Sequence, residues 1–263
     1  MTLKIVAGLI VRNEAERYLR WSLDQLLGLC HYVVVLDDGS DDGTADLLNE
    51  MKDPGLVVIR NKTSEFFQHE GRARQKLMDA VLEQMPTHIV CTDADELISN
   101  PQAVWEQVVA HCESPDRDKF RVWTLPMQEV WKADDNNLWI RCDGGWRPHG
   151  CPVVYSVPAG WEKKMRIKDQ ALACGRQPDI VNKEALARRS VQVDAEVLHF
   201  GWTCVTERAA RYERYAVNDG GRFHRNTHLQ SIMWPDRQVR MQRVGWPKEI
   251  LTYKEGIMQK VNS

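Results

Sequence analysis

The chain lacks the features that would place it in a membrane or send it out of the cell. The longest apolar run near its start, Ile5 to Val11, contains Gly8 and is far shorter than the ~20 residues that a membrane-spanning helix needs. No pattern of a cleavable signal peptide precedes this run. We therefore expect a cytoplasmic protein.

The chain also lacks the cysteine spacing of a disulfide framework or a zinc site, and a charge of one sign. Its seven cysteines are odd in number and irregularly spaced, and none forms a Cys-x-x-Cys pair. Its 35 Lys and Arg residues nearly balance its 37 Asp and Glu residues. With 263 residues, 43% of them hydrophobic, it can bury a substantial core as one large domain or a domain with an appendage. These features predict a globular protein with reduced thiols.

Short apolar runs alternate with helical patterns in the first half of the chain. Such alternation indicates βαβ units and a mostly parallel sheet. The strands are predicted at residues 3–11, 31–36, 56–59 and 87–91, and the helices around residues 18–27, 45–51 and 70–85.

Two of the predicted strands run directly into acidic residues. Residues 37–44 follow the second strand, and Asp93-Ala94-Asp95-Glu96 follows the fourth. Because ligands bind at the carboxyl ends of parallel strands, both clusters are expected at one edge of the sheet. On an extended backbone Asp93 and Asp95 would share a face and could bind a hard divalent cation. The alternatives are a helix cap or solvated loop at Asp93 and an Asx-rich turn that caps the helix at Thr44.

Four motifs occur in a distinctive order, namely residues 11–16 (VRNEAE), 37–44 (DDGSDDGT), 71–75 (GRARQ) and 93–96 (DADE). In this order they resemble family 2 glycosyltransferases of the GT-A fold. The resemblance implies an α/β fold, with a Rossmann-like mixed sheet flanked by helices, and a nucleotide-sugar donor, with a UDP-sugar favoured.

The same resemblance suggests how the chain is divided. Residues 1–203 would form a GT-A catalytic domain, with a nucleotide-sugar half at residues 1–112 and an acceptor half at residues 113–203. Residues 204–263 would form an Arg-rich helical C-terminal extension.

The resemblance also assigns roles to residues of the motifs. Asp38 would lie near the nucleobase, and Arg12 and Glu14 would line the nucleotide pocket. Asp93 and Asp95 would lie near a Mn²⁺ or Mg²⁺ ion that bridges the diphosphate.

The third motif departs from the family's usual Ala-Arg-Asn, because Gln75 replaces the asparagine. Arg72 or Arg74 could neutralise a phosphate or contact the base, since a guanidinium offers several donors to anionic oxygens. A surface position on the helix is the alternative for both arginines.

An inverting transfer needs a carboxylate to accept the proton of the acceptor. Four carboxylates are available in the middle of the chain, and we favour the first of them: Glu129, Asp134, Asp135 and Asp143. Next to the catalytic Asp95, Glu96 could orient a metal ligand or the sugar hydroxyls.

A late segment, residues 196–202, reads as a short strand that ends in His199 beside glycine. Several GT-A enzymes take a further metal ligand from a histidine in this part of the domain, and an imidazole suits Mn²⁺. His199 is therefore a candidate ligand, with a packed, hydrogen-bonded histidine as the alternative.

The end of the chain is rich in arginine, with eight Arg against four acidic residues between residues 201 and 243. Arg208, Arg211 and Arg214 fall three apart on a helix predicted at residues 206–217 and would share a face. That face could bind the diphosphate or a polyanionic acceptor such as nucleic acid, or could pair with acidic residues of the helix. The late segment resembles small phage glycosyltransferases. This likeness points to a virion protein or a hydroxymethylated DNA base as acceptor, with a bacterial surface glycan or lipid as the alternative.

One further segment has two interpretations. Residues 160–187 carry Lys163, Lys164, Arg166 and Lys168 close together, which suits either a loop that closes over donor phosphates or a solvated loop.

Two other functional classes are compatible with these residues. A nucleotidyltransferase shares the sheet and the metal carboxylates, but it normally has a Gly-rich loop after the first strand, and residues 11–16 contain no glycine. A non-catalytic module that binds sugar or nucleic acid is the third class. The nucleobase, the sugar, the acceptor, the stereochemistry and the oligomeric state are left open by the sequence.

Overall fold

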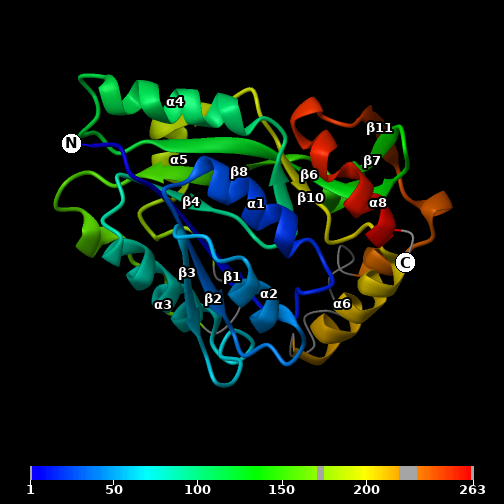
Figure 1. Cartoon of the computed structure of the whole chain (residues 1–263). Coiled ribbons are helices and arrows are strands. Elements are labelled where there is room, and N and C mark those ends of the chain that lie inside the picture. Colours follow the sequence, from blue (N-terminus) through cyan, green and yellow to red (C-terminus); the bar gives the residue numbers. More distant parts are fainter. Residues whose placement is uncertain (1, 171–174, 219–229, 262–263) are drawn as a thin grey trace. The chain divides into compact units, whose positions relative to one another are not determined.

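The structure is a computed structural model that describes residues 2–170, 175–218 and 230–261 (Figure 1). The chain forms two compact units, each built from several segments. Unit 1 comprises residues 1–94, 100–125 and 151–195. Unit 2 comprises residues 95–99, 126–150 and 196–263. The predicted extension at residues 204–263 is thus part of a unit that also contains strands from earlier in the chain.

Unit 1 contains a mixed sheet in the order β3-β2-β1-β4-β8-β6, which confirms the predicted α/β class. Its first four strands are parallel, and β8 is antiparallel to β4. The first residues of β6 belong to this unit and pair with β9. The strand bounds are β1 Ile5–Val11, β2 Tyr32–Asp37, β3 Leu56–Arg60, β4 His88–Cys91, β6 Val122–Ala133, β8 His149–Ser156 and β9 Ser190–Gln192.

Helices pack against this sheet because its strands are apolar on both faces. Val6 and Val34 belong to one core cluster with Leu77 and Val81 of α3. The alternate residues of β1 and β2 face the other way, and α1 also packs against these two strands. Gly8 is required for this packing, because a Cβ atom there would lie 2.8 Å from Cγ2 of Val81. The helices of unit 1 are α1 Leu19–Leu29, α2 Thr44–Glu50, α3 Glu70–Glu83, α4 Pro101–Glu113 and α5 Lys183–Arg189.

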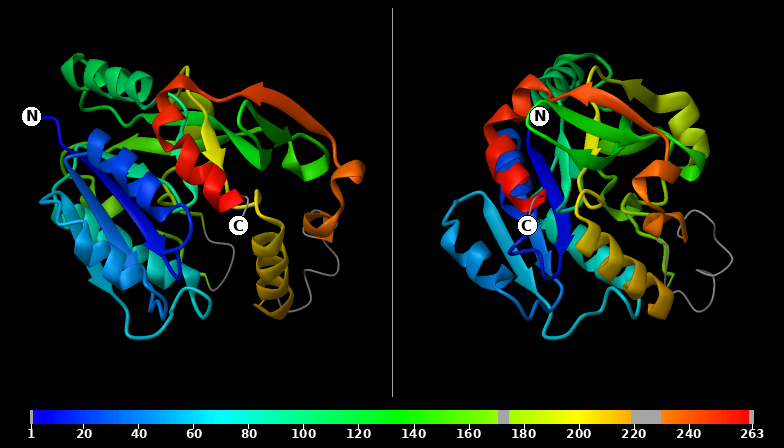
Figure 2. Two further views of the ribbon diagram at one scale, coloured as in Figure 1. Left: turned by 45° about the vertical axis from the view of Figure 1, so that its right-hand side comes forward. Right: turned by 90° about the vertical axis from the view of Figure 1, so that its right-hand side faces the viewer.

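Within its described residues, unit 2 contains a smaller group of strands and the α-helices α6 and α8 (Figure 2). Strand β10 lies between β5, to which it is antiparallel, and the later residues of β6, to which it is parallel. Strand β7 is antiparallel to β6 and to β11. The bounds are β5 Glu96–Ile98, β7 Asn137–Arg141, β10 Val197–His199, β11 Met241–Gly245, α6 Val205–Asn218 and α8 Lys254–Val261.

The prediction of a helical C-terminal extension is therefore wrong in part. Residues 241–245 form β11, because they pair along their whole length with β7. Helix α6 and the turns from residue 248 onward are helical within the described residues.

The core of unit 2 combines tryptophan rings with a buried arginine. Trp131, Trp146 and Trp202 pack together with Ile232. The Arg141 side chain is fully buried, with its guanidinium carbon 4.3 Å from the centre of the Trp131 ring and Nε 2.7 Å from Oδ1 of Asp143.

Two further findings concern the predictions made from composition. The six cysteines within the described ranges are free thiols, and Cys174 lies outside those ranges. None of the helices in the part of the chain that the structure describes has the length and apolar character to cross a membrane.

Candidate functional site

The sheet of unit 1 brings three strand ends to one edge. Val11 at the end of β1 is in register with Asp37 of β2, and Gly8 of β1 is in register with Cys91 of β4. Arg12 and Asp38 follow β1 and β2 directly, and Asp93 lies two residues after the end of β4. Their backbones therefore lie at the same edge, as the sequence predicted.

Two of the loops at this edge are joined by hydrogen bonds. The backbone N–H of Asn13 donates to Oγ of Ser40 (3.1 Å), and its side-chain amide donates to Asp41 (2.6 Å). The backbone N–H of Glu14 donates to Oγ1 of Thr44 (2.8 Å). Asp42 accepts from the backbone N–H of Thr44, so the Asx-turn interpretation holds for this part of the acidic cluster.

Arg12 and Glu14 lie in the first of these loops. The guanidinium carbon of Arg12 is 5.9 Å from the centre of the Phe67 ring. Oε1 of Glu14 is 2.5 Å from Nη1 of Arg17, and both side chains are largely buried. Glu14 therefore forms an ion pair with Arg17, in addition to the role in the nucleotide pocket that we predicted for it.

Asp38 is fully buried and organises the loop that follows β3. Its Oδ1 accepts from the Asn61 side chain (2.6 Å) and the backbone N–H of Glu65 (2.9 Å). Its Oδ2 accepts from the hydroxyl of Ser64 (2.6 Å) and the backbone N–H of Phe66 (3.0 Å). Both carboxylate oxygens of Asp38 thus accept hydrogen bonds from the protein. A nucleobase could bind Asp38 only by displacing one of these hydrogen-bond donors.

Gly39 allows the close approach of this loop. Its φ is +72°, and a Cβ atom there would lie 2.9 Å from the backbone N of Ser64. Any other residue would be strained in that conformation and would also meet the backbone.

The two arginines of the third motif differ in their surroundings. Arg72 is exposed, which agrees with the alternative of a surface position on the helix. Arg74 is largely buried, with Nε 2.8 Å from Oε1 of Glu70 and its guanidinium carbon 5.2 Å from the centre of the Phe66 ring.

The segment around Lys168 is docked on α3. Gln75, the departure from the family's pattern, accepts from the backbone N–H of Ile167 (2.8 Å). The backbone N–H of Gly71 donates to the carbonyl of Gln170 (3.0 Å), and a Cβ at Gly71 would collide with the carbonyl of Lys168. Ile167 is buried. This part of the segment is therefore docked on α3, while the side chains of Lys163, Lys164, Arg166 and Lys168 are exposed, as in a solvated loop.

The backbone between Asp93 and Asp95 turns at residues 94 and 95 instead of staying extended. The expectation that the two side chains share a face of an extended strand is therefore wrong. In unit 1, Asp93 is half-exposed, with Oδ2 3.3 Å from Nη1 of Arg176. Nη2 of Arg176 donates to Sγ of Cys151 (2.7 Å). No motif in the sequence pointed to Arg176.

Unit 2 places Asp95 beside two cationic groups. Its Oδ2 is 2.5 Å from Nη2 of Arg211, and its Oδ1 is 3.4 Å from Nε2 of His199. The other ring nitrogen of His199, Nδ1, is 2.6 Å from Oε2 of Glu129. The same oxygen accepts from Nε1 of Trp202 (2.7 Å).

Strand register explains this arrangement. His199 of β10 is paired with Glu96 of β5 on one side and with Glu129 of β6 on the other. Glu96 and Glu129 are both buried. The sheet therefore fixes the positions of both carboxylates relative to the histidine.

The closeness of these groups requires glycine at position 201. A Cβ atom there would lie 2.6 Å from Nη2 of Arg211 and 2.8 Å from Nε2 of His199, and would collide with Oδ2 of Asp95. Contacts this short do not occur at real Cβ atoms, so a larger residue would force a shift in this cluster.

The charges of the cluster stabilise one another. Burial alone would lower the pKa of His199, but the carboxylates of Glu129 and Asp95 outweigh it and raise that pKa well above its ordinary value. Burial likewise opposes the ionisation of Glu129, and the positive charge of His199 overcomes it and lowers the pKa of Glu129. We therefore describe Glu129, His199, Asp95 and Arg211 as a row of alternating charges.

No three His, Cys, Asp or Glu side chains converge on one point within the described residues, and His199 could bind a divalent cation only after its ring loses a proton. A carboxylate and an imidazole nitrogen face each other at Asp95 and His199, and both suit Mn²⁺. The second ring nitrogen of a ligating histidine commonly contacts a carboxylate, which is the contact that Glu129 makes.

The other carboxylates considered as proton acceptors lie in turns of unit 2. Asp134 accepts from the backbone N–H groups of Asn136 and Asn137 (2.8 Å each). Asp143 pairs with Arg141. Asp135 is exposed.

The predicted arginine face of α6 does not form as expected. Arg208 is buried, with its guanidinium carbon 4.3 Å from the centre of the Trp131 ring. Arg211 lies over Trp202 at 4.6 Å and binds Asp95. Arg214 is exposed, and Arg222 and Arg225 lie outside the described residues. Two of the three arginines therefore serve the interior of unit 2.

Comparisons with known proteins were made for the whole chain. Residues 8–190 match the family described as "Glycosyl transferase family 2". No curated protein matches the chain.

Several solved structures are similar to it at low identity. HddC from Yersinia pseudotuberculosis is 8% identical, with 75% of this chain and 93% of that chain covered and a TM-score of 0.40. A UDP-glucose pyrophosphorylase complexed with UDP-glucose is 8% identical, with coverage of 76% and 90% and a TM-score of 0.40. A putative nucleotide-diphospho-sugar transferase from Desulfovibrio desulfuricans G20 is 10% identical, with 99% of both chains covered and a TM-score of 0.40.

Proposed function

Because the match spans residues 8–190, the chain belongs to glycosyl transferase family 2, and we propose that it transfers a hexose from a nucleoside-diphosphate sugar to a hydroxyl group. The observation that carries the proposal, beside the family, is the set of residues at one edge of the unit 1 sheet. Arg12, Asp38 and Asp93 follow three parallel strands there, where this kind of sheet binds nucleotides. A UDP-sugar is the favoured donor.

In this proposal the loops of unit 1 hold the nucleoside. Arg12 and Glu14 line the pocket, and Asp38 fixes the loop at residues 61–66 through its four hydrogen bonds. Arg72 and Arg74 provide positive charge for anionic oxygens of the donor.

Asp95 and His199 would hold a Mn²⁺ or Mg²⁺ ion. When bound, such an ion stabilises the charge that develops on the leaving diphosphate. Glu96 and Glu129 flank His199 in the sheet, and the contact from Glu129 to Nδ1 keeps Nε2 directed at Asp95.

This contact also changes the role that we propose for Glu129. A base that accepts the proton of the acceptor must reach the acceptor hydroxyl. Glu129 is buried, and its Oε2 is engaged by His199 and Trp202. We therefore favour Glu129 as a positioning residue for His199 over Glu129 as the catalytic base.

The acceptor is a hydroxyl group of a sugar, a lipid, a protein or a modified DNA base. The prediction of a DNA base as acceptor depended on an arginine face of α6. Arg208 instead packs on Trp131, and Arg211 contacts Trp202 and Asp95. A surface glycan or lipid, or a virion protein, requires no such face, so an acceptor search starts with these.

The proposal is tested by nucleotide release from UDP-, GDP- and TDP-sugars, with Mn²⁺ or with EDTA. We expect slow hydrolysis of one donor with Mn²⁺, and its loss in EDTA and in Asp95→Ala. Asp118→Asn, which removes an exposed carboxylate of unit 1, is the matched control and is expected to behave like the wild type.

The product identifies the class of enzyme. A glycosyltransferase releases a nucleoside diphosphate, whereas a nucleotidyltransferase uses a nucleoside triphosphate and releases pyrophosphate. Pyrophosphate release from a triphosphate and a sugar phosphate would replace our proposal with the second class. Donor binding without release of any nucleotide, also in the presence of acceptors, would favour a binding module.

A further inference from the structure

The loop at residues 61–67 holds two adjacent phenylalanines at the edge of the sheet where β1 and β2 end. Asp38, the first residue after β2, is fully buried and accepts a hydrogen bond from the backbone N–H of Phe66 (3.0 Å). It accepts three further hydrogen bonds from the same loop. Asp38 therefore fixes the loop, and with it the position of Phe67, which follows Phe66 directly.

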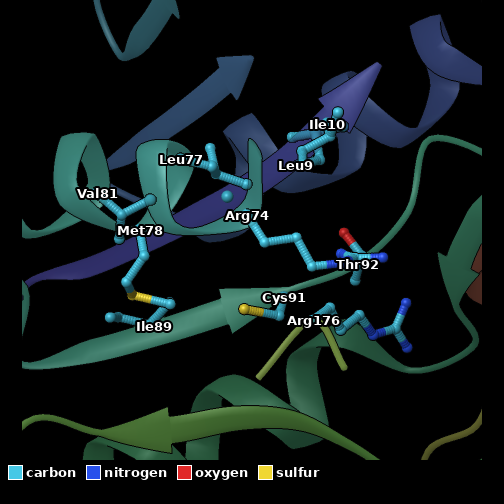
Figure 3. A pocket seen from close by; sticks show the side chains of 11 residues that line it. Leu9, Ile10, Arg74, Leu77, Met78, Val81, Ile89, Cys91, Thr92 and Arg176 are labelled. Carbon is cyan, nitrogen blue, oxygen red and sulfur yellow. The ribbon is translucent and has the colours of Figure 1, made fainter. Parts of the chain in front are cut away.

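The two phenylalanines differ in their surroundings. Phe66 packs against the core cluster that contains Leu77 of α3. The guanidinium carbon of Arg74 is 5.2 Å from the centre of the Phe66 ring, and Figure 3 shows how Arg74 extends from α3 toward Thr92. Phe67 stands edge-on to Phe66, with ring centres 5.7 Å apart and planes at 84°, and it is half-exposed. Phe66 thus serves the core, whereas part of the Phe67 ring is accessible to a ligand.

Arg12, the first residue after β1, lies beside Phe67. Its guanidinium carbon is 5.9 Å from the centre of the Phe67 ring, and its side chain is half-buried. Within the described residues, no hydrogen bond or ion pair engages the Arg12 side chain. A guanidinium offers several N–H donors in one plane. A ring and a set of free donors, placed together at the ends of parallel strands, suit a ligand that has both a flat face and acceptor atoms.

The space shown in Figure 3 is too small for such a ligand. It lies between α3 and the strands β1 and β4 and has room for about one water molecule. A ligand of the size of a nucleoside therefore binds outside this space, on the surface of the loops.

A nucleobase has both of the required features. Every base has a π-face, which stacks on an aromatic side chain. Uracil, thymine, cytosine and guanine also carry a ring carbonyl oxygen, which accepts from a guanidinium, whereas adenine has none. Phosphate oxygens would suit Arg12 as well, but they would leave the Phe67 ring uncovered. Asp38 is not available to bind the base, because its oxygens accept hydrogen bonds from the loop.

We propose that Phe67 stacks on the base of the donor nucleotide and that Arg12 donates to a carbonyl oxygen of this base, while Asp38 acts as a positioning residue for the loop. The base is therefore not adenine. This inference rests on the proposed function, because it concerns the donor of the same reaction. It adds the residues that select the base.

The test measures nucleotide binding and needs no turnover. The wild type is titrated calorimetrically with UDP, GDP, TDP, CDP and ADP, and with inorganic pyrophosphate as a ligand that has no base. We expect at least one of the first four nucleotides to bind about 10-fold or more tightly than ADP, because ADP gives Arg12 no carbonyl acceptor.

Variants of Phe67 locate the base on its ring. Phe67→Leu keeps an apolar side chain but removes the ring, and it is expected to weaken the preferred nucleotide about 10- to 100-fold. Binding of pyrophosphate should not change. Phe67→Tyr keeps the ring and should bind the nucleotide as the wild type does.

Variants of Arg12 test the hydrogen bond to the base. Arg12→Met is expected to weaken the preferred nucleotide about 10-fold and to leave ADP unchanged, so that the preference is lost. Arg188→Met, which removes an exposed arginine of α5, is the control and should keep the preference.

A merely structural role of Phe67 gives a different result. If Phe67→Leu weakens pyrophosphate as much as the nucleotide, the ring supports the site only through the fold, and the inference is wrong. Urea denaturation of the same variant shows whether the protein is still folded. If it is not, Phe67→Tyr and Arg12→Met still decide, since a loss of binding in the first or a retained preference in the second overturns the inference.

A failure of the inference differs from a failure of the proposed function. If the wild type binds ADP as tightly as the other nucleotides, or if Phe67→Leu binds the preferred nucleotide unchanged, the inference is wrong and the transferase remains. If the wild type binds none of the nucleotides or their sugars, the proposed function itself fails, and the inference with it.

Discussion

Asp95 shows how much of the site depends on single side chains. Its carboxylate lies between a guanidinium at 2.5 Å and an imidazole at 3.4 Å, and all three groups are largely buried. Hydrogen bonds to ionised groups are stronger than neutral ones and hold geometry more tightly. The position of Asp95 is therefore set by Arg211 and His199, and that of His199 by Glu129.

Gly201→Ala tests whether this tight cluster matters for activity. The added Cβ would collide with Asp95 and come within 2.8 Å of the other two groups, so at least one of them must move. A displacement of about 1 Å at an active site can cost about 10²-fold in rate. We expect a loss of that order in nucleotide release.

Gly245→Ala is the matched control for this substitution. A Cβ at Gly245 meets nothing within 4 Å, so the variant should keep its activity. If Gly201→Ala remained fully active while correctly folded, the cluster would not be part of the catalytic machinery.

Sequence reasoning singled out Asp95 and His199 from short motifs, and the structure brings the two side chains together. It assigned Glu129 a different role from the one its contacts support. The link between Glu129 and His199 spans 70 positions and depends on the pairing of β6 with β10. Arg176 lies outside every motif. Contacts of this kind depend on tertiary structure, which residue type and local spacing do not reveal.

At the scale of elements, α6 is anchored by its arginines and not free for a polyanion. Arg208 packs over Trp131, and its Nη1 is 3.9 Å from Oδ1 of Asp236. Burial lowers the pKa of Arg208, and the carboxylate of Asp236 acts in the opposite direction. The helix thus contributes to the core of unit 2 through cationic side chains.

Arg208→Ala is therefore expected to destabilise the protein. A desolvated cation–π contact contributes about 2 kcal/mol, and the lost packing adds to it. We expect a loss of about 2–3 kcal/mol in the free energy of unfolding, measured by urea denaturation. The exposed Arg214 offers the control, because Arg214→Ala should change the stability by less than about 0.5 kcal/mol.

The same pair of variants tests the idea of a nucleic-acid face. If Arg208→Ala kept full stability and instead weakened a salt-sensitive binding of DNA, the core role of Arg208 would be refuted.

The elements of unit 1 were largely predictable, since each strand and helix has its own periodic pattern and turn residues. The elements of unit 2 were less predictable from the sequence. Strand β6 is 12 residues long, and its first and later residues pair with different strands, β9 and β10, so local pattern alone does not fix its extent. Strand β11 has only five residues, and its partner β7 lies about a hundred positions earlier, so pairing and not local pattern decides its conformation.

For the molecule as a whole, acid stability depends on a buried pair of histidines in unit 1. Nε2 of His88 is 3.1 Å from Nδ1 of His111, and Nδ1 of His88 is 3.0 Å from Oγ1 of Thr87. Burial, together with His111, lowers the pKa of His88 to about 3. Burial also lowers the pKa of His111, although backbone carbonyls of Lys119 and Asp116 oppose it.

The sign of the effect follows from these directions. A histidine in the unfolded chain titrates near pH 6.5. Below that pH the unfolded chain therefore binds protons that His88 and His111 do not bind in the folded protein. Stability contributed by the pair is therefore full above pH 6.5 and falls as the pH drops toward the folded pKa. Each proton involved changes the free energy of unfolding by up to about 1.4 kcal/mol per pH unit.

His88→Gln isolates this contribution. Between pH 7 and pH 5, where carboxylates are still ionised, the wild type should lose more stability than His88→Gln in urea denaturation. Asp116, Lys119 and Arg121 also face His111, and they are unchanged in the variant, so their effects cancel. The same pH dependence in both proteins would contradict the account.

The most direct test of the central claim is a crystal structure with Mn²⁺ and UDP, in which anomalous scattering locates the metal ion. We predict a Mn²⁺ ion bound by Asp95 and His199, with Glu129 still bonded to Nδ1 of His199. A metal ion elsewhere, with Asp95 still paired to Arg211, would contradict the assignment of the site.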